Sequence, residues 1–435
     1  MVFLCLSHNI AAETVIDPDR AVSLALENNL ALKKNQIDLA ASGYSEKRLW
    51  SEIFPTISAS ASAGYRSALF SGDGFEIDEN NRSYSTGIVI NLGLNAGIPY
   101  SIKNIQLAHR SNILRYEDAR NQLSIQIIKK FYALVAERNN LDYLEEILTL
   151  AEKQYEKNQV SFRNGLLGEL ALMQSRLSVE NSRYSLSAAG IAYANNLGEF
   201  LAALGIAQDT KAALSGELRI VRITADAEAL IKQHLPDRPD IVRGRQEIER
   251  LEYAEKQTAM QSRAPSLTLS MDWRGSWMYS NPNAPDPFSD SLSGSAAINI
   301  PIDPWIPGTA RSQSVRRAND SVEKAKLDLS ITEDAAKTQI RSLAASLRNS
   351  WVSIEIARLS LEVAERSYQL TDQGFRNGTV ESLAVEDARN NMANARQRLL
   401  QSELSYFNMI LDLSAALNID WKNLINTFGA PNENQ

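Results

Sequence analysis

An internal repeat constrains the fold of this chain more than any other feature of the sequence. Residues Phe162, Arg163, Asn164 and Gly165 are repeated as Phe375, Arg376, Asn377 and Gly378, 213 positions later. The same offset superposes two rows of residues spaced by seven: Ile127, Leu134, Leu141, Leu148 and Tyr155 on Ile340, Leu347, Ile354, Leu361 and Tyr368. The chain therefore has two related halves, and each structural unit should occur twice.

The spacing of seven keeps one stripe of a helix against a partner helix, as in a coiled coil. It predicts one long helix in each half, over about residues 102–158 and 311–372, and neither range contains proline or glycine. At 1.5 Å per residue, each helix would be roughly 85 to 95 Å long. Glycine suits the left-handed conformation that ends a helix before the chain reverses. We therefore expect a second helix after each Arg-Asn-Gly turn, over 169–204 and 381–417, which completes an antiparallel hairpin.

Shorter helices are expected before the long ones, over about 18–52 and 226–263. A period of two follows each of them, and it predicts four strands of about ten residues. Each strand alternates apolar residues with small polar ones, over residues 57–65, 84–95, 267–274 and 291–300. This length and pattern suit tilted membrane-crossing strands with one face toward lipid and one toward water. A soluble sheet with one buried face fits the strand pattern equally well. Such a sheet would pack on nearby helices, however, and the apolar stripes of these helices are expected to pack against each other.

Aromatic residues are expected at the ends of membrane strands, where they form interfacial girdles. The sequence offers Tyr65, Tyr84, Trp273, Trp277 and Tyr279 for this role. Four strands cannot close a barrel, and an open sheet edge does not survive in lipid. Several chains must then share one barrel; two would supply eight strands and three would supply twelve.

Composition and residue spacing exclude several classes of protein. The 45 basic residues are interleaved with 52 acidic ones, for a net charge of -7, which argues against a nucleic-acid partner. No apolar run reaches the ~20 residues that a membrane-crossing helix needs. Cys5 is the only cysteine, and the three histidines are far apart, so no metal site is expected. We find no phosphate-binding loop and no nucleophile elbow. The sequence therefore predicts neither a cofactor nor an enzyme.

The proposed boundaries follow the repeat. Residues 1–17 contain a short apolar run and then Ala11 and Ala12, which we interpret as a truncated signal peptide or a disordered amino terminus. The first repeat covers 18–220, the second covers 221–420, and 421–435 would be a tail. The predicted fold class is mainly α with transmembrane β, in which a duplicated helical hairpin is combined with four strands per protomer.

This order of elements, given twice, resembles the TolC-like outer membrane efflux protein family, whose members are also called outer membrane factors. The resemblance covers roughly residues 18–420. It includes the segments 25–29 and 235–239 near the start of the halves, and 201–205 and 415–418 at their ends. It implies a homotrimer with one shared twelve-stranded barrel in outer membrane lipid and a long helical barrel in the periplasm. Such a passive exit channel serves tripartite efflux or type I secretion and docks a periplasmic adaptor of an inner-membrane transporter.

The resemblance also implies roles for particular residues. The turns Phe162–Gly165 and Phe375–Gly378 would lie at the periplasmic tips and dock the adaptor. Two acids constrict the closed tip of relatives, and Ala384 and Asp387 stand at their positions. Three copies of Asp387 would form a carboxylate ring that favours cations, to which Glu381 and Glu386 could add.

Two alternatives stay open at this stage. Asp387 could instead pair with a neighbouring arginine such as Arg389. Relatives latch the closed tip with a Tyr and an Arg, whose places hold Phe375 and Val380, so the latch is expected to be missing or built differently. The alternative function is a pore-less periplasmic coiled-coil protein, either structural or an adaptor.

Overall fold

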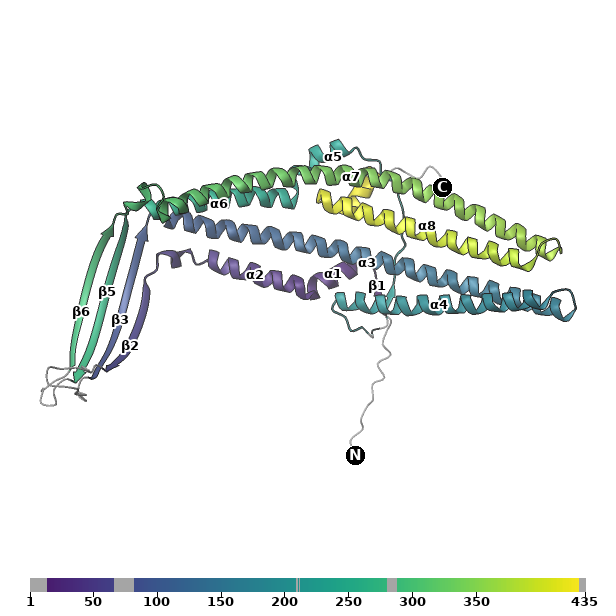
Figure 1. The fold of residues 1–435 in the computed structure, drawn as a ribbon, viewed down its shortest axis with the longest axis horizontal. Coiled ribbons are helices and arrows are strands. Elements are labelled where there is room, and N and C mark those ends of the chain that lie inside the picture. The colour runs from purple at the N-terminus through teal and green to yellow at the C-terminus, as the bar shows by residue number, and fades with distance from the viewer. Residues whose placement is uncertain (1–13, 66–81, 209, 211, 280–287, 430–435) are drawn as a thin grey trace, which may run out of the picture. The chain divides into compact units, whose positions relative to one another are not determined.

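The computed structural model describes residues 14–65, 82–208, 210, 212–279 and 288–429, drawn in Figure 1. The chain forms two compact units. The first contains Met1–Ile37, Leu114–Val242 and Ile331–Gln435, and the second contains Asp38–Ile113 and Arg243–Ser330. Each unit takes corresponding segments from both repeats, so the compact units cut across the boundary expected at residue 220. Most of the expected amino-terminal segment and most of the two strand-connecting loops lie outside the described residues.

The duplicated helical hairpin is present as predicted. The long helices are α3 (Ile98–Arg163, 66 residues) and α7 (Ala310–Arg376, 67 residues), and their partners are α4 (Glu169–Ala203) and α8 (Ser382–Leu417). α3 begins four residues earlier than expected because Pro99 is tolerated in the first turn, where its missing N–H would have no partner in the helix. The prediction of two long helices, each followed by a turn and a second helix, is confirmed.

The shorter helices are interrupted, which corrects the prediction of one helix over 18–52. α1 (Pro18–Asn28) ends before Asn29, and α2 (Leu30–Glu46) begins directly after it. The side-chain oxygen of Asn29 accepts hydrogen bonds from the backbone N–H groups of Ala31 and Leu32, at 3.0 and 3.1 Å, so it caps the new helix. A short 3-10 turn, η1 (Leu49–Ile53), follows α2.

The corresponding segment of the second repeat is interrupted at prolines. α5 (Ala227–His234) is followed by the turn η2 (Leu235–Asp237) and by α6 (Pro239–Arg263). Residues 421–435, expected to be a tail, begin with a further helix, α9 (Trp421–Phe428), whose Leu424 is completely buried.

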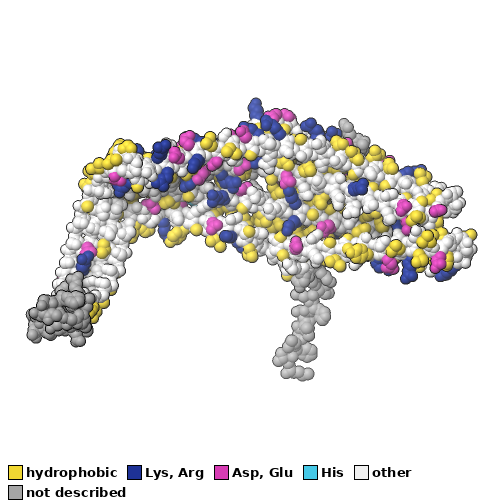
Figure 2. Space-filling model, in the orientation of Figure 1, with side chains coloured by type: hydrophobic (Ala, Val, Ile, Leu, Met, Phe, Trp, Pro, Cys, Tyr) yellow, Lys and Arg dark blue, Asp and Glu magenta, His cyan; other side chains and the backbone are white. Residues whose placement is uncertain are grey.

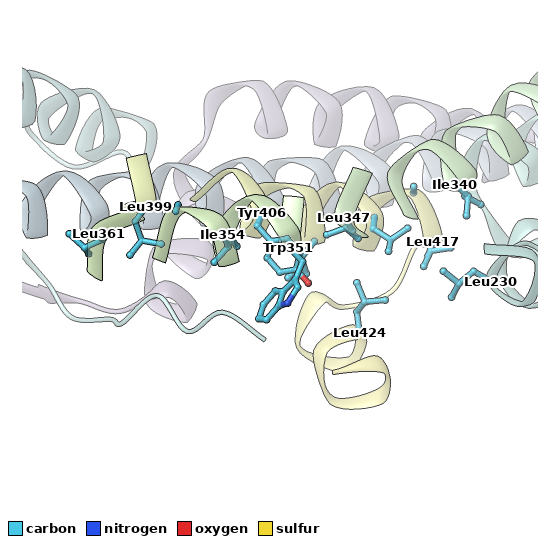
Figure 3. Packing of buried hydrophobic residues seen from close by; sticks show 14 of the residues in the cluster. Leu230, Ile340, Leu347, Trp351, Ile354, Leu361, Leu399, Tyr406, Leu417 and Leu424 are labelled. Atoms are coloured by element: carbon cyan, nitrogen blue, oxygen red, sulfur yellow. The ribbon is translucent and has the colours of Figure 1, made fainter. Parts of the chain in front are cut away.

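The core of the first unit follows the spacing of seven. Figure 3 shows one of its two clusters, in which residues of α7 pack against α8 and against Leu230 and Leu424. All four aliphatic members of the α7 row are buried: Ile340, Leu347, Ile354 and Leu361. The α3 row differs, because Leu141 and Leu148 are only half-buried while Ile147 and Ala151 are buried instead. A helix with 3.6 residues per turn drifts from a strict repeat of seven, so the buried stripe moves along α3.

The second unit contains a four-stranded antiparallel sheet in the order β2-β3-β5-β6. Its strands are β2 (Thr56–Tyr65), β3 (Arg82–Asn95), β5 (Ser266–Tyr279) and β6 (Phe288–Asn299). β3 pairs with β5 and so joins the two repeats, which leaves β2 and β6 as the outer strands. A third 3-10 turn, η3 (Asp303–Trp305), follows β6.

A small parallel pair in the first unit joins β1 (Thr14–Ile16) to β4 (Ala212–Leu214). Within the described residues, no helix is both long enough and apolar enough to cross a membrane.

Candidate functional site

One face of the sheet is lined by hydroxyl groups. The strand register brings Ser62 beside Ser85, with 2.7 Å between their Oγ atoms, and equivalent pairs join Ser270 to Ser295 at 2.6 Å and Ser276 to Ser289 at 2.9 Å. The same face carries Ser58, Ser60, Ser83, Ser266, Ser291 and Ser293. On the side of the strands visible in Figure 2, hydrophobic and charged side chains are sparse compared with the helices.

An ion pair lies on this hydroxyl-lined face. An Arg274 guanidinium nitrogen is 3.6 Å from a carboxylate oxygen of Asp272, two residues earlier on β5. Alternate residues of a strand share a face, so both charges stand among the serines. Charges facing lipid in the middle of a strand are costly, whereas charges in a water-filled lumen are tolerated. The ion pair therefore supports assigning this face to water.

The opposite face of the sheet is apolar and exposed. Across the strands, Ile88 lies between Ala59 and Trp273, and Leu292 follows Trp273 on β6. Leu292 is 69% exposed within the single chain. A contiguous apolar surface of this kind requires either a lipid or a protein cover.

The expected aromatic girdle is only partly realised. Tyr65, Tyr84 and Trp277 lie near the strand ends, and the rings of Trp277 and Phe288 are 4.7 Å apart. Trp273 instead lies in mid-strand, opposite Ile88, so its assignment to the girdle was wrong. The sequence showed only that Trp273 is on the apolar face; its position along the strand depends on β5 continuing to Tyr279.

A second group of aromatic residues, missed by the sequence analysis, lies at the other end of the strands. Trp50 and Phe54 stack edge to face at 5.2 Å beside the start of β2, and both are exposed. After β6, the exposed Trp305 lies 5.5 Å from the Arg263 guanidinium. Both segments are 3-10 turns, which have neither a period of two nor a period of seven. The apolar face of the sheet is thus flanked by aromatic residues at both ends.

The two glycine turns have the same geometry. Gly165 and Gly378 both have φ of 72°, and no atom lies within 4 Å of the position that a Cβ would take in either. In each turn an N–H just after the glycine reaches back to close the helix: Leu166 to Ser161 O and Thr379 to Gly374 O, each at 2.9 Å. Phe162, Arg163, Asn164, Arg376 and Asn377 are exposed, whereas Phe375 is partly buried.

The proposed constriction residues face different ways at the start of α8. Glu381 and Asp387 are exposed, Ala384 is partly exposed, and Glu386 is buried. Asp387 forms no ion pair with a described residue, and Arg389 is buried and donates to Ser178 Oγ on α4. The expected alternative of an Asp387–Arg389 pair is therefore not formed in the described chain.

Burial shifts the pKa values of two residues in this region, Glu386 and Arg389. Burial raises the pKa of the Glu386 carboxyl, with the nearby Asp387 acting in the same direction and Arg389 against it. Burial also lowers the pKa of the Arg389 guanidinium, and Glu386 opposes that shift. Glu386 and Arg389 are thus both buried and influence each other's charge, and Glu381 and Asp387 are the exposed acids of this region.

A buried polar chain joins the two repeats near the turns. Gln154 donates from Nε2 to Asn158 Oδ1 at 3.0 Å, and Asn158 donates from Nδ2 to Ser382 Oγ at 2.7 Å. Asn158 is completely buried. The sequence analysis missed this link between α3 and α8 because Gln, Asn and Ser usually indicate an exposed helix face.

Val380, which the resemblance compares with a latch residue, packs over Gly374. A Cβ added at Gly374 would lie 2.7 Å from Val380 Cγ2.

The family model described as "Outer membrane efflux protein" matches residues 21–206 and 230–418, which together make up most of the chain. The chain belongs to the outer membrane efflux protein family. This confirms the resemblance stated from the repeat, and no curated protein sequence matches significantly.

Solved structures show the same fold as this efflux protein. Crystal structures of CusC align with a TM-score of 0.72 at 16% identity, covering 92% of this chain and 91% of CusC. The Campylobacter jejuni CmeC outer membrane channel aligns with a TM-score of 0.72 at 19% identity, covering 94% and 88%. VceC of Vibrio cholerae aligns at 0.71 with 16% identity, covering 93% and 96%. The predicted class, mainly helical with a four-stranded sheet, is thereby confirmed.

Proposed function

We propose that this efflux protein is a passive exit channel of the outer membrane, formed by three copies that share one twelve-stranded barrel. The observation that carries the proposal is the sheet, which has a serine-lined face, an opposite apolar face and two outer strands that pair with no further strand among the described residues. In lipid, such outer strands must pair with those of other copies. The serine face then surrounds the lumen, and the apolar face with its two aromatic groups contacts lipid.

The strand count alone allows two or three copies, and the resemblance to TolC-like channels selects three. The helices form the periplasmic extension in this proposal. The channel catalyses no reaction, and an inner-membrane transporter supplies the energy. Within the described residues, no group of three or more His, Cys, Asp or Glu side chains is arranged to hold a metal ion.

The glycine turns form the docking tips for a periplasmic adaptor. Both turns are exposed and have the same backbone geometry, so one protomer presents two similar docking elements. They differ directly after the glycine, where the exposed Leu166 of the first turn corresponds to Thr379 in the second. Adaptor hairpins would therefore meet one apolar tip and one polar tip in each protomer.

Docking can be tested without straining either glycine. Asn164 and Asn377 are exposed and precede the glycines, so replacing both with Trp adds bulk at the tips, and Asn→Ala at both positions is the matched control. We expect in-cell cross-linking of the wild type and the Ala variant to recover a complex with an adaptor and an inner-membrane transporter. The Trp variant should lose that complex while its own particle mass is unchanged. An equal yield of complex from the Trp variant would contradict docking at the turns.

A further inference from the structure

A polar groove lies between α7 and α8 in the first unit. It has a volume of about 700 Å³ and is open to solvent. Ligand sites for small organic molecules have volumes of roughly 300 to 1,000 Å³. Six serines line this groove: Ser346, Ser350, Ser353 and Ser360 from α7, and Ser402 and Ser405 from α8. Small side chains on both helices thus leave space for a small molecule.

The groove contains an arginine without a partner. Among the described residues that line it, only Arg398 is charged. Its side chain is exposed, and its guanidinium forms neither an ion pair nor a hydrogen bond with a described residue. The two other arginines of α8 make contacts, because Arg389 donates to Ser178 Oγ and the Arg396 guanidinium lies 5.9 Å from the centre of the Tyr143 ring. The positive charge of Arg398 is therefore available to an anion.

The other residues of the groove combine neutral hydrogen-bonding groups with an apolar patch. Asn349 and Gln401 contribute side-chain amides, and Ile356, Ala357 and Met409 contribute apolar surface. Arginine presents a planar fork of N–H donors that matches a carboxylate. Hydroxyl and amide groups add hydrogen bonds without adding charge. The ligand that fits this set of groups has one carboxylate and an apolar body.

The groove lies on a face of α7 that other elements of the first unit leave open. Trp351 belongs to the buried cluster that includes Leu424 of α9 and Leu230 of α5 (Figure 3). Ser353 follows Trp351 by two positions, which turns its side chain by about 200° around the helix. α5 and α9 thus cover the face of α7 opposite the groove. In the proposed channel these covering elements belong outside the helical wall, because three copies of them would obstruct the lumen.

We infer that the groove faces the lumen and binds organic anions with an apolar body as they pass through the channel. The inference rests on the proposed exit channel, and it names a class of cargo for it. Asp387 precedes Arg398 by about three helical turns, roughly 16 Å, and so lies on the same side of α8. This separation exceeds the Debye length of ≈ 10 Å at 0.1 M salt, so Asp387 leaves the charge of Arg398 largely unopposed.

Equilibrium dialysis of the purified particle in detergent tests the inference. The probe is 1-naphthoate, which has one carboxylate on an apolar ring, and 1-naphthamide is its uncharged counterpart. Arg398→Gln removes the charge of the groove, and Ser353→Leu fills part of its volume. Arg396→Gln is the matched control, because it removes a charge from the side of α8 that faces Tyr143. All three positions are exposed, so the variants should fold, and the same detergent is present in every sample.

We expect the wild type and Arg396→Gln to bind one 1-naphthoate per chain with equal affinity. The dissociation constant should rise about ten-fold in Arg398→Gln, which loses the charge-assisted hydrogen bonds, and by a similar factor in Ser353→Leu. 1-Naphthamide should bind weakly and equally to all four proteins.

Equal affinity of the wild type and Arg398→Gln for 1-naphthoate would overturn the anion site. Unchanged affinity of Ser353→Leu would place the probe outside the groove and would also overturn it. Either result in a particle whose mass is trimeric leaves the exit channel standing. A particle that is not trimeric would instead overturn the proposed channel, and with it the passage of anions along the groove.

Discussion

Asp387 and Glu386 are neighbours in the sequence but differ in their exposure to solvent. Glu386 is buried, and burial raises the pKa of its carboxyl, whereas Asp387 is exposed and forms no ion pair with a described residue. The sequence placed both among the possible constriction residues because it contains no information about which helix face is covered. Of these acids, Asp387 and Glu381 are the exposed ones, so they stay candidates for the proposed constriction.

At the residue scale, Asp387→Asn should lower the cation preference of the channel. Three carboxylates around a narrow opening favour cations, and their removal should bring the K⁺/Cl⁻ permeability ratio toward one. The ratio is measured from reversal potentials in planar bilayers at about 0.1 M salt, where the Debye length is ≈ 10 Å.

Glu386→Gln is the control for this measurement, because its side chain is buried inside the protomer. It should leave the permeability ratio close to that of the wild type. A channel whose selectivity is unchanged by Asp387→Asn, or is changed equally by both variants, would exclude Asp387 as the constriction residue.

At the element scale, a residue of one repeat can serve as the control for the equivalent residue of the other. Tyr406 on α8 is completely buried; its hydroxyl accepts from Ile223 N–H at 2.8 Å and donates to Val221 O at 3.2 Å. These bonds hold the connection between the repeats against α8. Tyr193 occupies the equivalent position in the first repeat, is only partly buried, and makes no hydrogen bond to a described residue.

Tyr406→Phe should therefore lower the free energy of unfolding more than Tyr193→Phe. Loss of the hydroxyl removes this partner from the partly buried N–H of Ile223 and carbonyl of Val221, which costs about 1–3 kcal/mol for the two hydrogen bonds, whereas Tyr193→Phe should change stability by less than about 0.5 kcal/mol. Denaturant unfolding of the purified protein, followed by near-ultraviolet circular dichroism, compares the two. Equal losses would show that the hydroxyl of Tyr406 contributes nothing specific.

The elements were predictable where a strict period or a conformational requirement exists. Spacing by seven located α3 and α7, spacing by two located the strands, and Gly165 and Gly378 marked the turns. The break at Asn29 was missed because a capping asparagine within a helical pattern cannot be distinguished from an ordinary polar residue on the exposed face of one continuous helix. The link through Asn158 was missed for a related reason. It depends on a contact between the two repeats, with Ser382, and the pattern of either helix alone does not contain it.

At the scale of the whole molecule, the described sheet has two open edges. β2 and β6 are its outer strands, and one face of the sheet is apolar and exposed. In lipid, the open edges require strands of further copies of the chain, and the apolar face requires a cover of lipid or protein. A shared barrel would satisfy both requirements.

The protein mass of the membrane-extracted particle, with detergent subtracted, tests the shared barrel most directly. The chain has a mass of 48.2 kDa. The account predicts a particle of three such chains, less any segment removed from the amino end, that requires detergent to stay dispersed. A monomer or dimer that is soluble without detergent would contradict the channel and favour the pore-less coiled-coil alternative.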